Sequence, residues 1–376
     1  MTDATDDDST PWPAPRANPE LVGHGAAEAA FLKAHASSRL AHAWLIAGPR
    51  GIGKATFAFR CARALLASAL DSPAGSLAVP ADHPVFHRVA AASHANLRTI
   101  ERGRDPKTGR PRDQIVADSV RALQPFFGQT AGEEANEGGG PGWRIAVIDG
   151  AEEMNPTAAN ALLKLLEEPP ARGLILLVSH APGRLLPTLR SRCRALTLRP
   201  LVERQIEAML TARFPALAND DERRRMLARL GDGSVGRALG LAASGGDAFR
   251  ELFDIIARLP ALDHAVLHTL GDRLARPNNQ ADYHAVAETL VWWLARMIRA
   301  NAVGAPPAEV VGGETAVIER LAHACPLDRW VKVWDKIVDL FGRADQLNLD
   351  RKQVLLSAFA TLAQAARGQP TARRAA

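Results

Sequence analysis

Cysteine is scarce in this chain, and its scarcity excludes several kinds of site. Only three cysteines occur among 376 residues, and Cys61, Cys193 and Cys325 lie far apart. They build neither a disulfide framework nor a four-cysteine zinc site, and they are typical of a protein in a reducing compartment such as the cytoplasm. Apolar runs of about 18 residues are also missing, so we expect no membrane span. Residues 1–8 are acidic rather than apolar, and we expect no signal peptide.

Charge of either sign is hardly in excess. The 46 basic and 41 acidic residues leave a net charge of +5, with a pI near 9.4. An excess this small permits contact with nucleic acid but does not require it. The hydrophobic fraction of 47% and the charged fraction of 23% are those of a folded protein, and the length predicts two or three domains.

Three short, continuously apolar segments predict buried strands, and helical patterns lie between them. The expected strands are residues 43–47, 144–149 and 174–179. Such runs, separated by helices, are typical of a parallel sheet covered by helices on both faces. One helix is well delimited, because Asn155 can cap its start and Pro169 ends it.

Strand patterns stop near residue 200, and the rest of the chain has the pattern of helices separated by short turns. The sequence therefore predicts an α/β domain followed by two helical domains. The acidic and proline-rich N-terminus is expected to be a disordered tail. The expected boundaries are 1–19 for the tail, 20–200 for the α/β domain, and 201–248 and 249–376 for the two helical domains.

A glycine-rich loop between the first strand and the next helix matches a phosphate-binding motif. Residues 48–54 have the sequence Gly-Pro-Arg-Gly-Ile-Gly-Lys, which fits the pattern G-x-x-x-x-G-K. Gly48, Gly51 and Gly53 let backbone N–H groups approach phosphate oxygens, and Lys54 adds a positive charge at the N-terminus of a helix. We therefore expect a nucleotide-binding loop, either a working or an ancestral one.

The hydroxyl that would complete this loop is missing. Ala55 stands where a Ser or Thr ligates Mg²⁺ in a working loop. Thr56 is next to it, but a shift of one residue turns its side chain by about 100° around the helix. Whether the loop still binds ATP is left open by the sequence.

The acidic part of an ATPase site is also incomplete. Asp149 ends the second strand, where a carboxylate holds Mg²⁺ through water. Gly150 follows, at the position of a catalytic glutamate. Glu152 and Glu153 are either its replacements or part of the loop that leads into the next helix. Two defects in one chain favour a nucleotide-site scaffold that does not turn over ATP.

Four motifs occur in an order that resembles a known family. They are Leu40-Ala41-His42-Ala43, the phosphate loop at 48–54, the stretch Asn160-Ala-Leu-Leu-Lys-Leu-Leu-Glu-Glu-Pro-Pro170, and Leu-Arg-Ser-Arg-Cys at 189–193. Together they resemble the bacterial clamp-loader AAA+ proteins of DNA polymerase III. The resemblance covers residues 20–245 by motif and the remaining helices by placement and length.

The resemblance implies an AAA+ P-loop domain, a small helical lid domain and a C-terminal all-α collar domain. It also implies membership of a heteropentamer with motor and delta subunits, which uses ATP to load a sliding clamp onto primed DNA. Contact with the clamp and with DNA would come through this complex, which belongs to a DNA-directed DNA polymerase holoenzyme. In this family the arginine of Ser-Arg-Cys reaches the ATP site of a neighbouring motor subunit, so the resemblance assigns that role to Arg192.

Departures from the motor members favour a stator, a subunit that supports the complex without hydrolysing ATP. Ala55 and Gly150 replace motor-type residues, and Gly236 stands where motors carry a sensor arginine, with Arg237 displaced by one position. The leading expectation is a stator that requires no cofactor, although ATP or ADP can occupy its degenerate loop. The alternatives are an ATP-hydrolysing motor of the gamma/tau type, and a P-loop protein unrelated to replication.

Many members of the family hold a zinc ion through four cysteines between the phosphate loop and the second strand. That region of this chain contains His83, His87 and His94 but no cysteine. A zinc site made of histidines alone is chemically allowed. Scattered surface histidines are the simpler interpretation, and we expect no metal.

Two further patterns have two interpretations each. A basic loop either contacts DNA phosphates or is solvated, and tryptophan-rich stripes either form a helical core or contribute to an interface between subunits. The basic residues are Arg102, Arg104, Lys107, Arg110 and Arg112, and the stripes are residues 291–294 and 330–334.

Overall fold

The computed structural model describes residues 13–37, 39–68, 76–104, 112–128, 142–243, 248–347 and 349–368. Contacts divide the chain into two compact units. Unit 1 comprises residues 1–213 and 231–237, and unit 2 comprises residues 214–230 and 238–376. The predicted domain boundaries at 200 and 248 remain a prediction. No helix of the described residues is both long and apolar enough to cross a bilayer.

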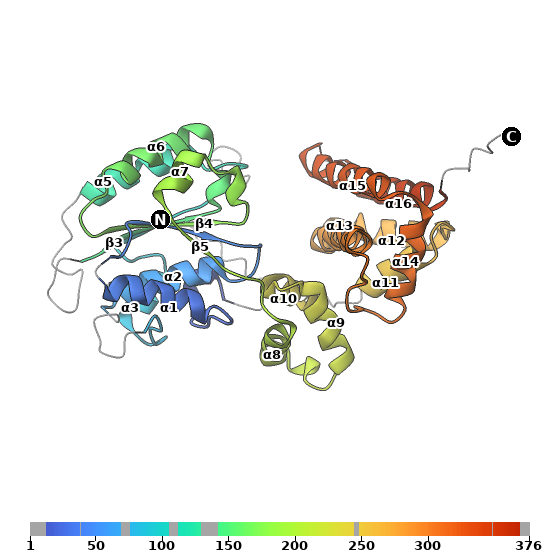
Figure 1. The fold of residues 1–376 in the computed structure, drawn as a ribbon, viewed down its shortest axis with the longest axis horizontal. Helices are drawn as coiled ribbons and strands as arrows, with labels where there is room; N and C mark the ends of the chain where they lie inside the picture. Colours follow the sequence, from blue (N-terminus) through green and yellow to red (C-terminus); the bar gives the residue numbers. More distant parts are fainter. Residues whose placement is uncertain are drawn as a thin grey trace. The chain divides into compact units, whose positions relative to one another are not determined.

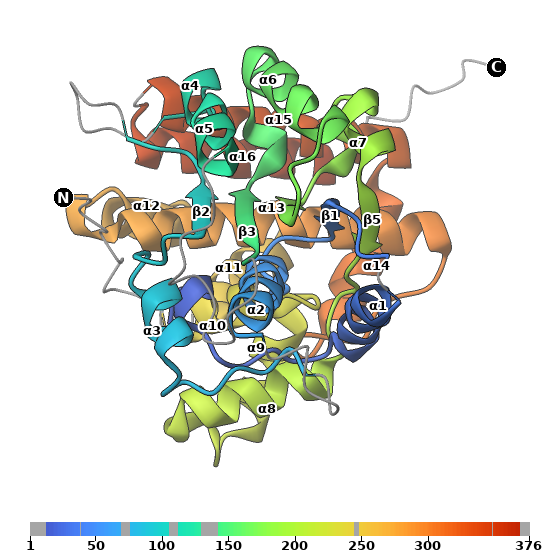
Figure 2. The ribbon, with the colours of Figure 1, turned by 90° about the vertical axis from the view of Figure 1, so that its left-hand side faces the viewer.

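Among the described residues of unit 1, five parallel strands form one sheet in the order β2-β3-β4-β1-β5. Figure 2 shows β2 at one edge and β5 at the other. The strands are β1 (Ala43–Ala47), β2 (Leu97–Ile100), β3 (Arg144–Asp149), β4 (Gly173–Ser179) and β5 (Arg194–Thr197). The predictions of β1 and β3 are confirmed at both ends, and β4 begins one residue earlier than predicted.

Helices cover both faces of this sheet, as predicted, with α1, α2 and α3 on one side and α5, α6 and α7 on the other (Figure 1). The helices of unit 1 are α1 (Gly25–Ala36), α2 (Lys54–Leu66), α3 (Pro84–Ala90), α4 (Ala117–Arg121), α5 (Leu123–Gly128), α6 (Pro156–Glu167), α7 (Pro187–Arg192) and α8 (Glu203–Arg213). The predicted start of α6 is confirmed, because the Asn155 side chain accepts a hydrogen bond from the Ala158 N–H at 2.8 Å.

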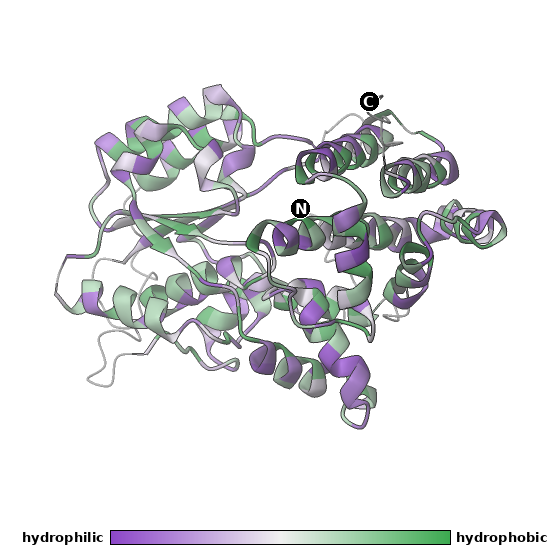
Figure 3. Ribbon diagram, turned by 45° about the vertical axis from the view of Figure 1, so that its right-hand side comes forward, coloured by the Kyte–Doolittle hydropathy of each residue, from purple (hydrophilic) through white to green (hydrophobic). Residues whose placement is uncertain are grey.

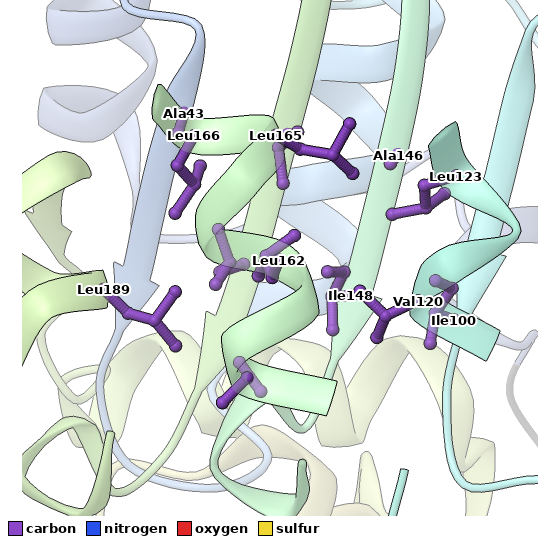
Figure 4. Packing of buried hydrophobic residues seen from close by; sticks show 14 of the residues in the cluster. Ala43, Ile100, Val120, Leu123, Ala146, Ile148, Leu162, Leu165, Leu166 and Leu189 are labelled. Carbon is purple, nitrogen blue, oxygen red and sulfur yellow. The ribbon is translucent and has the colours of Figure 1, made fainter. Parts of the chain in front are cut away.

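Alternate residues of each strand supply two apolar layers. Ala146 and Ile148 of β3 point to one side, into an apolar cluster that also contains Leu162 and Leu166 of α6 and Leu189 of α7 (Figure 4). The neighbouring residues of the strands point to the opposite side, as Trp44 of β1 does in packing against Phe31 of α1 with ring centroids 5.2 Å apart. The central strands of the sheet are therefore mostly green in Figure 3.

The prediction that residues 1–19 are disordered is wrong for residues 13–19, which the structure describes. Residues Pro15–Ala17 form a 3-10 helix, η1. The buried guanidinium of Arg63 in α2 donates hydrogen bonds to the carbonyls of Arg16 and Asn18, both at 2.8 Å. A buried guanidinium needs acceptors, and this segment supplies them. Residues 1–12 lie outside the described part of the chain.

Unit 2 is helical in its described residues, and no strand follows Thr197 in the described chain. Two of its helices extend by a few residues into unit 1. The helices are α9 (Asp221–Gly231), α10 (Val235–Ala243), α11 (Ala248–Ala257), α12 (His264–Leu274), α13 (Gln280–Val303), α14 (Glu314–Ala324), α15 (Leu327–Leu347) and α16 (Arg351–Ala366). Asp350 is the N-cap of α16, where its carboxylate accepts a hydrogen bond from the Gln353 N–H at 2.8 Å.

The tryptophan stripes contribute to the core of unit 2. Trp293 and Trp330 are each 1% exposed. The Trp293 indole N–H donates to the carboxylate of Glu314 at 3.0 Å, and Trp330 donates to the carbonyl of Leu321 at 2.9 Å. The core interpretation is confirmed for these two residues, and a role in subunit contact stays a prediction.

Candidate functional site

The carboxyl ends of β1, β3 and β4 meet at one edge of the sheet. Ala47 at the end of β1 lies in register with Ser179 at the end of β4, and Asp149 at the end of β3 lies in register with Val178. Residues 48–53 leave β1 at this edge and lead into α2. Open α/β sheets bind ligands at this edge. The fold therefore places the predicted loop and the predicted acidic residue at a position suited to nucleotide binding.

The loop needs glycine for its backbone conformation. Gly48, Gly51 and Gly53 all have positive φ, with Gly51 at +70°. A Cβ on Gly51 would lie 2.3 Å from the hydroxyl oxygen of Ser234. Both the conformation and the space at this position therefore exclude a larger residue.

Residues 233–237, which belong to unit 1, close against this loop. The Gly236 N–H donates to the Gly51 carbonyl at 2.8 Å, and the Arg237 N–H donates to the Ser234 hydroxyl at 3.1 Å. A Cβ on Gly236 would lie only 3.1 Å from the Gly51 Cα. Motor members of the resembled family carry a sensor arginine here, whereas this chain makes a backbone contact with the loop.

Lys54 and Asp149 are brought together and shift each other's titration. The Lys54 ammonium donates to the Pro49 carbonyl at 2.5 Å and is buried. Burial lowers its pKa to about 8, and the nearby Asp149 carboxylate opposes that change. Burial raises the pKa of Asp149 to about 6, aided by Glu101 and opposed by Lys54. Lys54 and Asp149 therefore lie close enough for each charge to act on the other, and their predicted roles in holding phosphate and Mg²⁺ stay predictions.

The backbone at Gly150, where the resemblance places a catalytic glutamate, disfavours a side chain. Gly150 has φ +75°, and a Cβ there would lie 2.7 Å from a carboxylate oxygen of Glu153. Ala55 is half-buried in the first turn of α2, and Thr56 is buried beside it.

Glu152 and Glu153, the open candidates for replacement, belong to the 3-10 helix η4 (Ala151–Glu153); hydrogen bonds hold Glu152, and ion pairs with arginines hold Glu153. The Glu152 carboxylate is 1% exposed, pairs with the His180 imidazole and accepts the His180 N–H at 3.1 Å. Burial alone would raise the pKa of Glu152, but hydrogen bonds from Ser179 and His180 lower it. Glu153 lies 2.9 Å from Arg102 and 3.5 Å from Arg50.

His180 completes this network and was missed from the sequence. The Arg50 guanidinium of the phosphate loop donates to His180 Nε2 at 2.9 Å. His180 directly follows the carboxyl end of β4. A polar residue at this position of a parallel strand is a candidate site residue, and this signal could have identified His180 from the sequence. Arg50, His180, Glu152 and Glu153 thus link the loop to the ends of β3 and β4 through hydrogen bonds and the Arg50–Glu153 ion pair.

Arg192 lies elsewhere, at the C-terminal end of α7, where its side chain is 38% exposed. One of its nitrogens lies 2.8 Å from the Glu167 carboxylate, and another donates to the Thr188 carbonyl at 3.2 Å. Leu166 and Leu189 pack in the same apolar cluster below (Figure 4). The two motifs at 160–170 and 189–193, separate in the sequence, therefore meet at this corner. No pattern in the sequence had indicated Glu167 as the partner of Arg192.

The remaining candidates have other contacts. Arg102 of the basic loop pairs with Glu153, whereas Lys107 and Arg110 lie outside the described residues. His83 caps α3, and His94 is buried, where desolvation lowers its pKa to about 4. In the described parts of the chain, no group of three or more His, Cys, Asp and Glu side chains is placed to hold a metal ion. The expectation of no zinc stays a prediction.

Several known proteins are similar in sequence to parts of this chain. Residues 23–202 match the family described as DNA polymerase III, delta subunit. The delta-prime subunits of DNA polymerase III from Pseudomonas aeruginosa and Bacillus subtilis are 40% and 33% identical, over 41% and 46% of this chain and 42% and 46% of their own lengths. The tau subunit from Salmonella typhimurium is 28% identical over 81% of this chain and 47% of its own length.

The chain thus spans less than half the length of these relatives. The family match at residues 23–202 includes the parallel sheet, the phosphate loop and the Ser-Arg-Cys motif. Residues 23–202, just under half of the chain, match the DNA polymerase III delta-subunit family, and the chain is delta-prime-like in its similarity to the delta-prime subunits of DNA polymerase III.

Proposed function

We propose that this chain is the stator subunit of a DNA polymerase III clamp loader and donates Arg192 to the ATP site of a neighbouring motor subunit. The observation that carries the proposal is an exposed guanidinium at the end of a rigidly packed helix, in a chain whose own phosphate loop lacks hydrolytic groups. An arginine supplied in trans stabilises the charge that develops on a transferred phosphoryl group.

The geometry at the loop supports a role without hydrolysis. Gly150 has a positive φ that disfavours a glutamate side chain, and Ala55 has no hydroxyl for Mg²⁺. Lys54 and Asp149 still form an anion- and cation-attracting pair, so ATP or ADP can bind without being turned over. The proposal requires no nucleotide and no zinc.

The partners follow from this role. The chain would assemble with motor and delta subunits into a cytoplasmic heteropentamer that loads a sliding clamp onto primed DNA. The clamp and the DNA would be reached through the complex, and the polymerase activity would belong to the holoenzyme. The family match and the delta-prime relatives support this assignment.

The test is the Arg192→Ala variant in the complex reconstituted with motor and delta subunits. We expect the DNA-stimulated ATPase rate to fall by about 10²-fold or more, the scale of an arginine finger, while the complex still assembles. Arg190→Ala is the matched control, since it removes an exposed arginine from the same helix, and it should keep near wild-type activity. Normal ATPase activity with Arg192→Ala would refute the proposal.

The motor alternative rests on the preserved Lys54–Asp149 pair. It is tested by ATP turnover of the purified chain alone. A Lys54-dependent rate on the order of 1 per second, within the range of working enzymes, would favour the motor and contradict the stator. We expect no Lys54-dependent turnover.

A further inference from the structure

We infer that Glu167 is the positioning residue of Arg192, holding its guanidinium in the orientation in which it meets a neighbour's phosphate. This inference rests on the proposed function and goes beyond it by naming a second residue in the same device. The evidence is the ion pair between the last residues of α6 and α7, with Arg192 and Glu167 2.8 Å apart.

Packing fixes the distance between the two helix ends. Leu162 and Leu166 of α6 and Leu189 of α7 share one buried cluster, so neither helix can move alone (Figure 4). Pro169 follows the end of α6 closely and prevents it from continuing. Glu167 is therefore presented at a fixed place beside the end of α7.

The contacts of Arg192 orient its guanidinium but use only some of its hydrogen-bond donors. A guanidinium has five N–H donors in a planar fork. One terminal nitrogen contacts the Glu167 carboxylate and the other donates to the Thr188 carbonyl. The remaining N–H groups stay available for a phosphate oxygen. An unpaired arginine would sample many rotamers, and each contact removes some of them before the neighbour arrives.

The pair is suited to this task and poorly suited to holding the fold together. The Arg192 side chain is 38% exposed and that of Glu167 is 51% exposed. Exposed ion pairs contribute little to stability because water screens them. Loss of the carboxylate should leave folding and assembly intact and change the efficiency with which the finger acts.

The matched control is supplied by the next residue. Glu168 is also exposed and carries the same charge, one position further along the chain. The ion pair of the described structure joins Arg192 to Glu167. Glu167→Gln and Glu168→Gln therefore remove the same charge from neighbouring positions, and only the first removes the contact.

The experiment is the steady-state ATPase of the complex reconstituted with motor and delta subunits. Glu167→Gln should lower kcat about five- to tenfold with the KM for ATP unchanged, because the neighbour still binds ATP but receives a less ordered arginine. Glu167→Asp keeps the charge on a shorter side chain and should recover part of the loss. Glu168→Gln should match the wild type.

A double variant separates positioning from an independent role. If Glu167 acts through Arg192, then Glu167→Gln added to Arg192→Ala should lower the rate no further. A further loss would overturn the inference, as would a wild-type rate or a raised rate for Glu167→Gln alone. A raised rate would mean that Glu167 restrains the arginine. A wild-type rate for Arg192→Ala would instead remove the proposed function itself, so the two failures are distinguishable.

Discussion

The phosphate loop and the end of α7 both belong to unit 1, but they hold their charged groups in opposite ways. Lys54 is 7% exposed and lies within the field of Asp149, with the pKa values of both displaced by burial. Arg192 and Glu167 are partly open to solvent and pair with each other at the surface. One region is enclosed by its own chain, and the other is accessible to a partner.

Because of this difference, variants at the loop should affect stability, and variants at the end of α7 should affect function. Buried charges pay a desolvation penalty that the folded chain must offset, so changes at the loop should appear first in the unfolding free energy. Exposed pairs are nearly neutral for folding, so changes at the end of α7 should appear in the rate of the assembled complex. Variants in the two regions should therefore fail in different assays.

The largest stability effect in the loop region is a dependence on pH. The pKa of Asp149 is about 6 in the folded chain against an ordinary value of 3.8, and burial is the main cause. The folded state thus binds the proton more tightly, and this contribution is present below pH 4 and lost as the pH rises through 6. The loss is on the order of 2–3 kcal/mol.

Asp149→Asn removes that titration. We expect the variant to lose the part of the stability slope between pH 4 and 7 that Asp149 causes, as measured by urea unfolding followed by circular dichroism at both ends of this range. Glu167→Gln alters an exposed carboxylate and should retain the wild-type slope. Equal slopes in the wild type and Asp149→Asn would contradict the enclosed character of the loop site.

Replacing a glycine of the loop by alanine should have a smaller effect on the free energy of unfolding than the titration of Asp149. Gly51→Ala puts a Cβ 2.3 Å from the Ser234 hydroxyl at a φ of +70°. Moving Ser234 would break its hydrogen bond from the Arg237 N–H, and the conformation itself is unfavourable for alanine. We expect a loss of about 2 kcal/mol, or roughly 4–8 °C in Tm.

Gly183→Ala is the counterpart near α7. A Cβ on Gly183 has no neighbour within 4 Å, and its φ is not positive. Thermal unfolding should show no measurable change for this variant. If Gly51→Ala were equally silent, the loop would not be held as tightly as its contacts with residues 234–237 indicate.

The sequence was informative where burial is complete and weak where it is not. Strands β1, β3 and β4 are central, and their continuous apolar runs revealed them. The edge strands β2 and β5 were missed, because two of the four residues in β2 and three of the four in β5 are exposed. An edge strand needs one apolar face at most, and four residues are too few for the alternation to be recognised.

The site shows the same limit. The loop and Asp149 were predicted because motif residues are local and parallel strands end at one edge. The contacts of His180 with Arg50, and of Glu167 with Arg192, join residues that are 130 and 25 positions apart. Such contacts depend on how packed elements meet, and no spacing within the sequence encodes that.

The smallest effect is expected for Lys54→Ala in the assembled complex. If the loop is a scaffold, removal of its lysine should change the complex's ATPase rate by less than about twofold, which is under ~0.5 kcal/mol in activation free energy. The measurement is the same reconstituted assay used for Arg192→Ala, with assembly checked by gel filtration. A tenfold loss would show that the enclosed loop contributes to turnover, and the contrast between the two regions would then fail. If Lys54→Ala leaves the ATPase rate unchanged and Arg192→Ala lowers it strongly, the chain contributes to catalysis through the exposed end of α7 and not through its own phosphate loop.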